Sequence, residues 1–88
     1  MTSAFRRRFL RDLKKVRAES VRVRARSAIE AVEAADSLAD VPGLRKLSGA
    51  DRFYRIRIGD YRIGLFVDGD TVEFVRLLHR RDMYRYFP

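Results

Sequence analysis

The sequence contains no cysteine and no tryptophan, and it has a single histidine, His79. Without thiolates there can be no disulfide and no thiolate-bound zinc, and one histidine cannot build a metal site unaided. We therefore expect no metal ion and no cofactor. No apolar run approaches the ~18 residues of a membrane-spanning helix, and the N-terminal stretch MTSAFRRRFLRDLKK lacks the apolar core of a secretory signal. A cytoplasmic protein without a membrane partner is the expectation.

Acidic residues are scarce relative to basic ones. The sequence has 20 lysine and arginine residues against 12 aspartate and glutamate residues, a formal net charge of +8. Such an excess predicts affinity for a polyanion, which can be a nucleic acid, an acidic protein or an anionic membrane surface. Basic residues occupy 1–26 and 45–85, and the segment between them carries only acidic charge, from Glu30, Glu33, Asp36 and Asp40.

Apolar spacing predicts two helices in the first part of the chain. The first covers about Arg6–Val16, and the second follows Ser20, which we expect to be its N-cap. Because the second apolar stripe is rich in alanine and valine, that helix can lie close to a neighbour, and we expect a helical hairpin. Before the helices, Thr2–Phe5 can form a short edge strand. The two stripes consist of Phe5, Phe9, Leu13 and Val16, then of Val21, Ala25, Ala28, Ile29, Val32 and Ala35.

The second half of the chain predicts an antiparallel sheet. An irregular connection, DSLADVPG at residues 36–43, precedes it. The last of three strand-length runs is apolar on both faces, which is typical of an internal strand covered on both sides. Residues 79–88 remain as a short basic and aromatic tail. The predicted strands are Phe53–Ile58, Tyr61–Val67 and Thr71–Leu78, separated by the turns Gly59-Asp60 and Asp68-Gly69-Asp70.

The 88 residues are therefore expected to form one α+β domain over residues 1–88. Two N-terminal helices, arranged as a hairpin, would pack on one face of a small twisted antiparallel sheet of three to four strands, with the short tail at the C-terminus. Strand alternation places the apolar side chains on the helix-covered face. It places Arg55, Arg57 and Arg62 on the opposite face, which Arg80 reaches from the end of the third strand.

Arginines beside exposed aromatic rings are typical of single-stranded RNA recognition. Guanidinium groups bind phosphates, and flat rings stack on splayed bases. The alternative is that these arginines pair across strands with Glu73, Asp51 and Asp60. From residue 45 onward only six acidic residues accompany ten basic ones, so a basic surplus must face solvent or a partner. An arginine-rich genome would also produce basic helices, but it accounts less well for arginines that alternate with core residues.

His79 is the only side chain of the sequence that is ordinarily suited to proton transfer near neutral pH. It follows the last predicted strand directly and precedes two arginines. One interpretation makes it a catalytic base beside the arginine cluster. The other makes it a structural residue that forms a hydrogen bond at a strand end.

The order of these features resembles the RelE/ParE superfamily of toxins from bacterial and archaeal toxin–antitoxin pairs. The resemblance covers essentially the whole chain and depends on LRKLSG in the connection, YRIRIGDYRIGLF in the first hairpin and HRRDMYRYF at the end. It implies a compact α+β fold with two N-terminal helices against a twisted antiparallel sheet. It also implies one of two activities.

RelE-like members of the superfamily enter the ribosomal A site and cleave mRNA, with the 2′-hydroxyl of the substrate attacking the adjacent phosphate. ParE-like members keep the fold but poison DNA gyrase, and they usually lack the basic constellation. In this sequence the cleavage positions of the family fall on Arg55, Arg57, Arg62, Arg80 and Tyr84. Because these positions are basic or aromatic here, the resemblance favours the RNase branch.

The sequence departs from that pattern on the first strand of the hairpin, where the best-known RelE proteins carry lysine and this chain carries Arg55 and Arg57. Arginine is a poor proton acceptor, because its guanidinium stays charged. The arginines would therefore hold and neutralise the phosphate, with Arg80 near the leaving oxygen. His79 or Tyr84 would take or relay the proton, and Tyr84 could alternatively stack on a base.

Three functional hypotheses follow. The first is a ribosome-dependent mRNA endonuclease that represses translation, with an acidic antitoxin as its partner and mRNA in the A site as its substrate. The second is a non-nuclease toxin that inhibits gyrase. The third is a non-toxic antitoxin-binding module. In each case the complex with the antitoxin could bind operator DNA.

Overall fold

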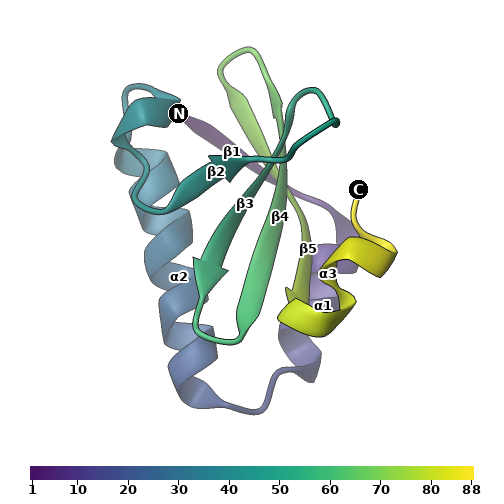
Figure 1. The fold of residues 1–88 in the computed structure, drawn as a ribbon. Coiled ribbons are helices and arrows are strands. Elements are labelled where there is room, and N and C mark those ends of the chain that lie inside the picture. Colours follow the sequence, from purple (N-terminus) through teal and green to yellow (C-terminus); the bar gives the residue numbers. More distant parts are fainter.

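The computed structural model describes residues 1–88 as an α+β fold built on one five-stranded sheet (Figure 1). Two helices lie behind the sheet in this view, and a third lies in front of it near the C-terminus. In chain order the elements are β1 (Thr2–Phe5), α1 (Arg7–Lys15), α2 (Glu19–Ala34), a 3₁₀ turn (Leu38–Asp40), β2 (Leu44–Lys46), β3 (Phe53–Ile58), β4 (Tyr61–Asp68), β5 (Thr71–His79) and α3 (Arg80–Tyr86).

The strands lie in the order β1-β5-β4-β3-β2. Strand β1 runs parallel to β5, and the other neighbouring pairs are antiparallel. The α+β class is confirmed, and so is the edge strand at Thr2–Phe5. The sheet has one strand more than predicted and is mixed rather than purely antiparallel. Strand β2 was missed because three residues are too few to show the two-residue alternation of a strand.

The main core lies between the sheet and the two N-terminal helices. Phe9 of α1, together with Ala25 and Val32 of α2, is fully buried against Ile63 and Leu65 of β4. The predicted apolar face of the sheet is therefore confirmed. Helix α2 begins at Glu19 after Ala18, which forms no side-chain cap, so the prediction of Ser20 as N-cap was wrong.

Arg22 joins the two helices of the predicted hairpin. Its Nη1 donates to the carbonyl oxygens of Leu13 and Val16, each at 3.2 Å, where α1 has ended. A cation at this position satisfies carbonyl groups that the helix leaves without a partner, and it interacts favourably with the helix dipole. The connection between the helices is thereby fixed by a residue of the second helix.

A smaller core lies on the other face of the sheet. Leu78 of β5 packs there with Leu47, Met83 and Phe87, and each of these residues is at most 9% exposed. The predicted tail is thus a short helix, α3, that is anchored by its apolar side. Strand β5 is covered on both faces, as its continuous apolar sequence predicted.

Asp12 of α1 closes the edge of β5 at the point where β1 has ended. Its carboxylate accepts a hydrogen bond from the backbone N–H of Leu77 at 3.0 Å and binds Arg76 at 2.8 and 3.1 Å. The side chains of Asp12 and Arg76 are only 9% and 15% exposed. Asp12 therefore replaces the missing strand as a hydrogen-bond acceptor, and it neutralises a guanidinium that the fold has largely buried.

No helix of the structure combines the length and the apolar character needed to cross a membrane. Nor do three histidine, aspartate or glutamate side chains gather in an arrangement that could hold a metal ion.

Replacing Asp12 by alanine leaves a buried guanidinium and a buried backbone N–H without an acceptor. We expect the free energy of unfolding to fall by about 3–5 kcal/mol, the usual cost of removing one partner of a buried ion pair. Urea denaturation followed by circular dichroism measures this change. Replacing the exposed Glu30 by alanine is the matched control and should change stability by less than about 0.5 kcal/mol. A loss below about 1 kcal/mol for Asp12→Ala would contradict the assignment.

Candidate functional site

The candidate site lies on the sheet face opposite α1 and α2, which we call the open face. Across the β3–β4 hairpin Arg57 lies directly opposite Arg62, and Arg55 lies opposite Gly64. Arg45 of β2 lies opposite Arg55. Residues directly opposite each other in an antiparallel pair project from the same face. Four arginines from three neighbouring strands therefore project from the open face.

The two-residue turn between β3 and β4 sets this arrangement. Ile58 pairs with Tyr61, so Gly59 and Asp60 form the whole loop, and Gly59 has a φ of +63°. Glycine is favoured at such a position because a side chain would be strained there. A one-residue change of register would move the arginines into the core, so the apolar face and the turn together fix the position of the arginines.

Acidic residues do not neutralise these arginines. Glu73 binds Arg6 at 2.8 Å, and Asp51 binds Lys46 at 3.6 Å. The other ion pairs are Arg52 with Asp68 and Arg76 with Asp12. None of these ion pairs includes an arginine of the cluster, which consists of Arg45, Arg55, Arg57, Arg62 and Arg80. The cross-strand pairing that was the alternative interpretation is therefore absent.

Arg62 is the most constrained member of the cluster. Its Nη1 donates to the carbonyl oxygens of Gly59 and Tyr61 at 3.0 and 2.9 Å, so its guanidinium is held near the hairpin turn. Burial lowers the pKa of Arg62, and the positive charges of Arg57, Arg55 and Arg80 lower it further, while Tyr84 acts in the opposite direction. The neighbouring arginines thus repel the charged form of Arg62, and no ion pair with an acidic side chain offsets that repulsion.

Helix α3 adds Arg80 and Tyr84 to the open face. The backbone N–H of Arg80 donates to the carbonyl oxygen of Asp60 at 2.7 Å, which ties the start of the helix to the β3–β4 turn. Tyr84 follows one helical turn later and is 75% exposed. Its ring lines a hollow of about 340 Å³ together with Arg55 and Lys46. The predicted site residues Arg55, Arg57, Arg62, Arg80 and Tyr84 are thus brought together.

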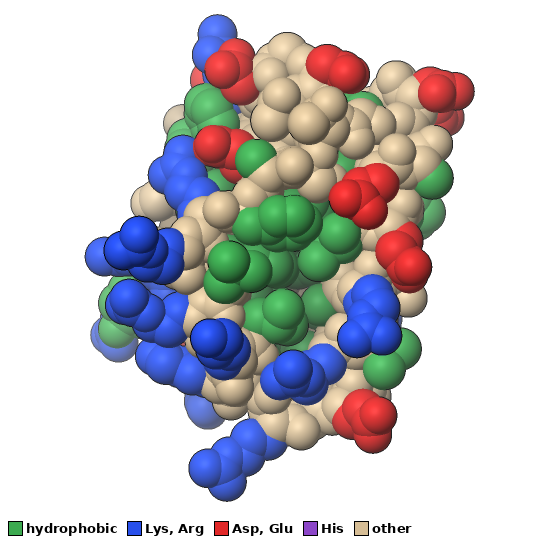
Figure 2. All heavy atoms as spheres, turned by 180° about the vertical axis from the view of Figure 1, so that it is seen from behind, with side chains coloured by type: hydrophobic (Ala, Val, Ile, Leu, Met, Phe, Trp, Pro, Cys, Tyr) green, Lys and Arg blue, Asp and Glu red, His purple; other side chains and the backbone are tan.

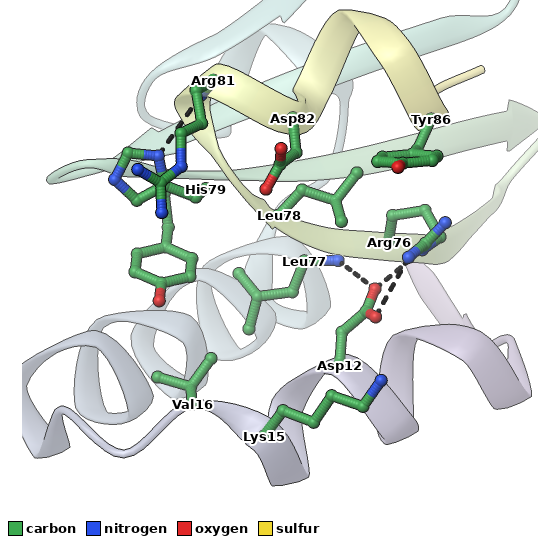
Figure 3. A pocket seen from close by; sticks show the side chains of 11 residues that line it. Asp12, Lys15, Val16, Arg76, Leu77, Leu78, His79, Arg81, Asp82 and Tyr86 are labelled. Atoms are coloured by element: carbon green, nitrogen blue, oxygen red, sulfur yellow. Dashed lines mark hydrogen bonds and ion pairs between the residues drawn. The ribbon is translucent and has the colours of Figure 1, made fainter.

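His79 is not brought to this cluster. It lies opposite Tyr61, and alternation directs both rings to the helix-covered side, where their centroids are 5.5 Å apart. Its Nδ1 accepts a hydrogen bond from the backbone N–H of Arg81 at 3.3 Å and so caps α3. His79 lines a different pocket, shared with Asp12 and Lys15 (Figure 3). This position matches the structural interpretation of His79.

Sequence reasoning missed the roles of two residues that shape the site. Arg45 joins the cluster only through the pairing of β2, which was not predicted. Gly64 matters because a Cβ at this position would lie 2.7 Å from the ring of Phe87. The ring of Phe87 therefore packs directly against the glycine, and the end of α3 lies on the open face. The glycine inside a strand was the one available signal, since such a residue often marks a close approach.

The chain matches the family model described as ParE toxin of the type II toxin–antitoxin system parDE over residues 4–84. It is 43% identical to Toxin RelE3 of Methanocaldococcus jannaschii over 89 aligned positions, which cover 100% of both chains. Its structure is similar to the toxin of a RelB–RelE antitoxin–toxin complex from Methanococcus jannaschii, with a TM-score of 0.81, 41% identity and coverage of 97% of this chain and 99% of that one.

A more distant likeness exists to the isolated RelE toxin of E. coli. The TM-score is 0.66 at 22% identity, with coverage of 89% of this chain and 82% of that chain. At this identity the match shows a shared fold.

Replacing Gly64 by alanine should displace Phe87 and loosen α3, because the added methyl group overlaps the ring. We expect a loss of about 1–3 kcal/mol, typical of overpacking, and faster amide hydrogen exchange in residues 80–87. Adding Phe87→Leu in the same molecule should restore part of the protection by making room for the methyl group. Unchanged exchange in α3 of the single variant would show that the contact does not hold the helix.

Proposed function

The chain belongs to the RelE/ParE superfamily of toxins, and from this premise we propose that it is a ribosome-dependent mRNA endonuclease that represses translation. The observation that carries the proposal is the set of arginines on the open face without an acidic partner. Such a surface is suited to a phosphate. The relative named Toxin RelE3 supports the RelE branch. A protein with this function would act in the cytoplasm, on mRNA in the ribosomal A site.

In the proposed reaction the 2′-oxygen of a nucleotide bonds to the adjacent phosphorus and the bond to the 5′-oxygen of the next nucleotide breaks. The 2′-hydroxyl loses its proton, and the leaving 5′-oxygen gains one. Negative charge accumulates on the phosphate in the transition state. Arg55, Arg57 and Arg62 would bind the phosphate oxygens, and Arg80 would lie near the leaving oxygen. Charge stabilisation of this kind is commonly the largest catalytic contribution.

Proton transfer is assigned to Tyr84 as a relay. Arginine remains charged at physiological pH and does not accept a proton. A neutral phenol can accept the proton of the 2′-hydroxyl only while it passes its own proton to water. Tyr84 would therefore relay a proton to solvent, and the leaving 5′-oxygen would take its proton from solvent. Tyr84 lines the same hollow as Arg55, whereas the pairing of His79 with Tyr61 directs its side chain to the helix-covered side of the sheet. Stacking of Tyr84 on a base would be compatible with the same position.

An acidic antitoxin is the proposed protein partner. The similar archaeal structure is of a toxin bound to its antitoxin, and this chain carries a formal charge of +8. Behind the sheet, apolar side chains are exposed between basic groups and acidic groups (Figure 2), and Leu10 and Val23 are 45% and 52% exposed. An amphipathic segment with acidic residues would suit such a surface. The complex could in turn bind operator DNA.

Inhibition of DNA gyrase is the second candidate function. The observation that favours it is the match to a family model described as ParE toxin. A gyrase inhibitor would act by binding, so it would need neither ribosomes nor the arginine cluster as a phosphate site.

Expression of the chain without an antitoxin should arrest translation and leave mRNAs cut within ribosome-bound codons. Replacing Arg62 by alanine should lower the cleavage rate by about 10²-fold or more, because it removes a charge that stabilises the transition state. Mapping of mRNA 5′ ends after brief induction measures both effects. Arg26→Ala on α2 removes the same charge far from the site and should cleave like the wild type. Equal cleavage by the Arg62→Ala and wild-type proteins, at equal soluble amounts, would refute the site assignment.

The gyrase alternative is distinguished by supercoiling and DNA-cleavage assays with purified gyrase and no ribosomes. We expect no inhibition. Growth arrest with intact mRNA, together with inhibition of gyrase in vitro, would replace the proposed function by the second candidate.

A further inference from the structure

A second basic hollow borders the open face on the side of α1. Its volume is about 440 Å³, and it lies where the start of α1, strand β5 and the C-terminal residues meet. We call it the α1 hollow. Its lining consists of Arg6, Arg7, Arg8, Val75, Arg76, Tyr86, Phe87 and Pro88.

The charges of the α1 hollow are only partly compensated. The guanidinium of Arg6 is bound by Glu73 through two hydrogen bonds of 2.8 and 3.2 Å. Arg76 is bound by Asp12. Arg7 and Arg8 form no ion pair, and the first turn of α1 contains no acidic residue. Two exposed guanidinium groups are thus free to bind an anion.

The remaining walls are apolar and aromatic. Val75 and Phe87 contribute apolar surface, and the ring of Tyr86 is 53% exposed. The guanidinium carbon of Arg85 lies 5.9 Å from the centre of that ring. A bare phosphate ion would use only the arginines. A nucleotide would use both parts, with its phosphate on the guanidinium groups and its base on the ring.

The α1 hollow adjoins the proposed cleavage site. Phe87 and Pro88 line it on one side and also line the hollow of Arg55 and Tyr84 on the other. Phe87 lies over Gly64 in the middle of the open face, because a Cβ on Gly64 would meet its ring. A single strand that leaves the arginine cluster and crosses Phe87 and Pro88 would reach the α1 hollow next.

We propose that the α1 hollow is a second RNA subsite, which binds the single strand continuing from the cleaved phosphate. Arg7 and Arg8 bind a backbone phosphate, and Tyr86 stacks on a base. The identity of the ligand rests on the proposed function, in which the open face binds RNA. The subsite extends that function, because it predicts that binding depends on the length of the RNA.

The test measures binding of fluorescein-labelled oligoribonucleotides of three and nine nucleotides to the full chain by fluorescence anisotropy at several salt concentrations. Replacing Arg7 and Arg8 together by alanine should weaken binding of the nonamer about tenfold and leave the trimer within about twofold of the wild type. The slope of log K against log salt for the nonamer should become shallower by about 0.7 for each phosphate that the variant no longer neutralises. Tyr86→Ala should weaken the nonamer at least fivefold, about the lower end of base stacking.

Matched variants separate the subsite from general electrostatics. Arg17→Ala combined with Arg26→Ala removes the same charge at exposed positions outside the hollow, and should weaken the nonamer much less. If the Arg7/Arg8 variant is less stable than the wild type by thermal unfolding, Arg7→Gln with Arg8→Gln removes the charges while keeping longer side chains. Equal nonamer affinity of the hollow variants and the Arg17/Arg26 control would overturn the proposal. The proposal would also be overturned if the hollow bound a labelled decaglutamate peptide but did not bind RNA.

Failure of the proposed function is a separate result. A wild-type chain that leaves ribosome-bound mRNA intact is not an endonuclease, whereas the length-dependent weakening in the Arg7/Arg8 variant is measured without ribosomes or cleavage.

Discussion

The register of the β3–β4 hairpin is the constraint on which the site depends. It places Arg57 directly opposite Arg62, although like charges at opposite positions destabilise a sheet. The burial of Ile56, Ile58 and Ile63 on the other face holds the register against that repulsion. The folded protein therefore presents a guanidinium cluster that no acidic residue neutralises. In the proposed function, a bound phosphate would relieve this repulsion.

The two faces of the sheet have different roles. One face, covered by α1 and α2, supplies most of the hydrophobic core. The other has a small core under α3 and leaves room for charge beside it. The ring of Phe87 on Gly64 connects the two, because it packs the C-terminal end of α3, the helix that carries Tyr84, against the open face. This contact therefore links the packing of α3 to the geometry of the site.

Much of the hairpin and its chemistry could be predicted from the sequence, because its determinants are local. The alternation of isoleucine and arginine and the Gly59-Asp60 turn were enough to assign faces. The ion pair of Asp12 with Arg76 joins residues 64 positions apart in the chain, and neither residue forms a local pattern that predicts the other. The place of Arg45 in the cluster was not predicted either, because its strand is only three residues long and shows no clear alternation. His79 was assigned two possible roles because a position at a strand end beside two arginines suits either one, and only its pairing with Tyr61 shows its side of the sheet.

The central claim is that the open-face arginines bind a phosphate of RNA. The most direct measurement follows the Nε–Hε signals of the arginines by ¹⁵N nuclear magnetic resonance, assigned with single Arg→Lys variants, during titration with an oligonucleotide whose 2′-hydroxyl groups are replaced by hydrogen. Without the attacking group this ligand cannot be cleaved. The account predicts that the largest shifts occur at Arg55, Arg57, Arg62 and Arg80. Unchanged signals from these four, with shifts confined to arginines of α2 such as Arg26, would contradict it.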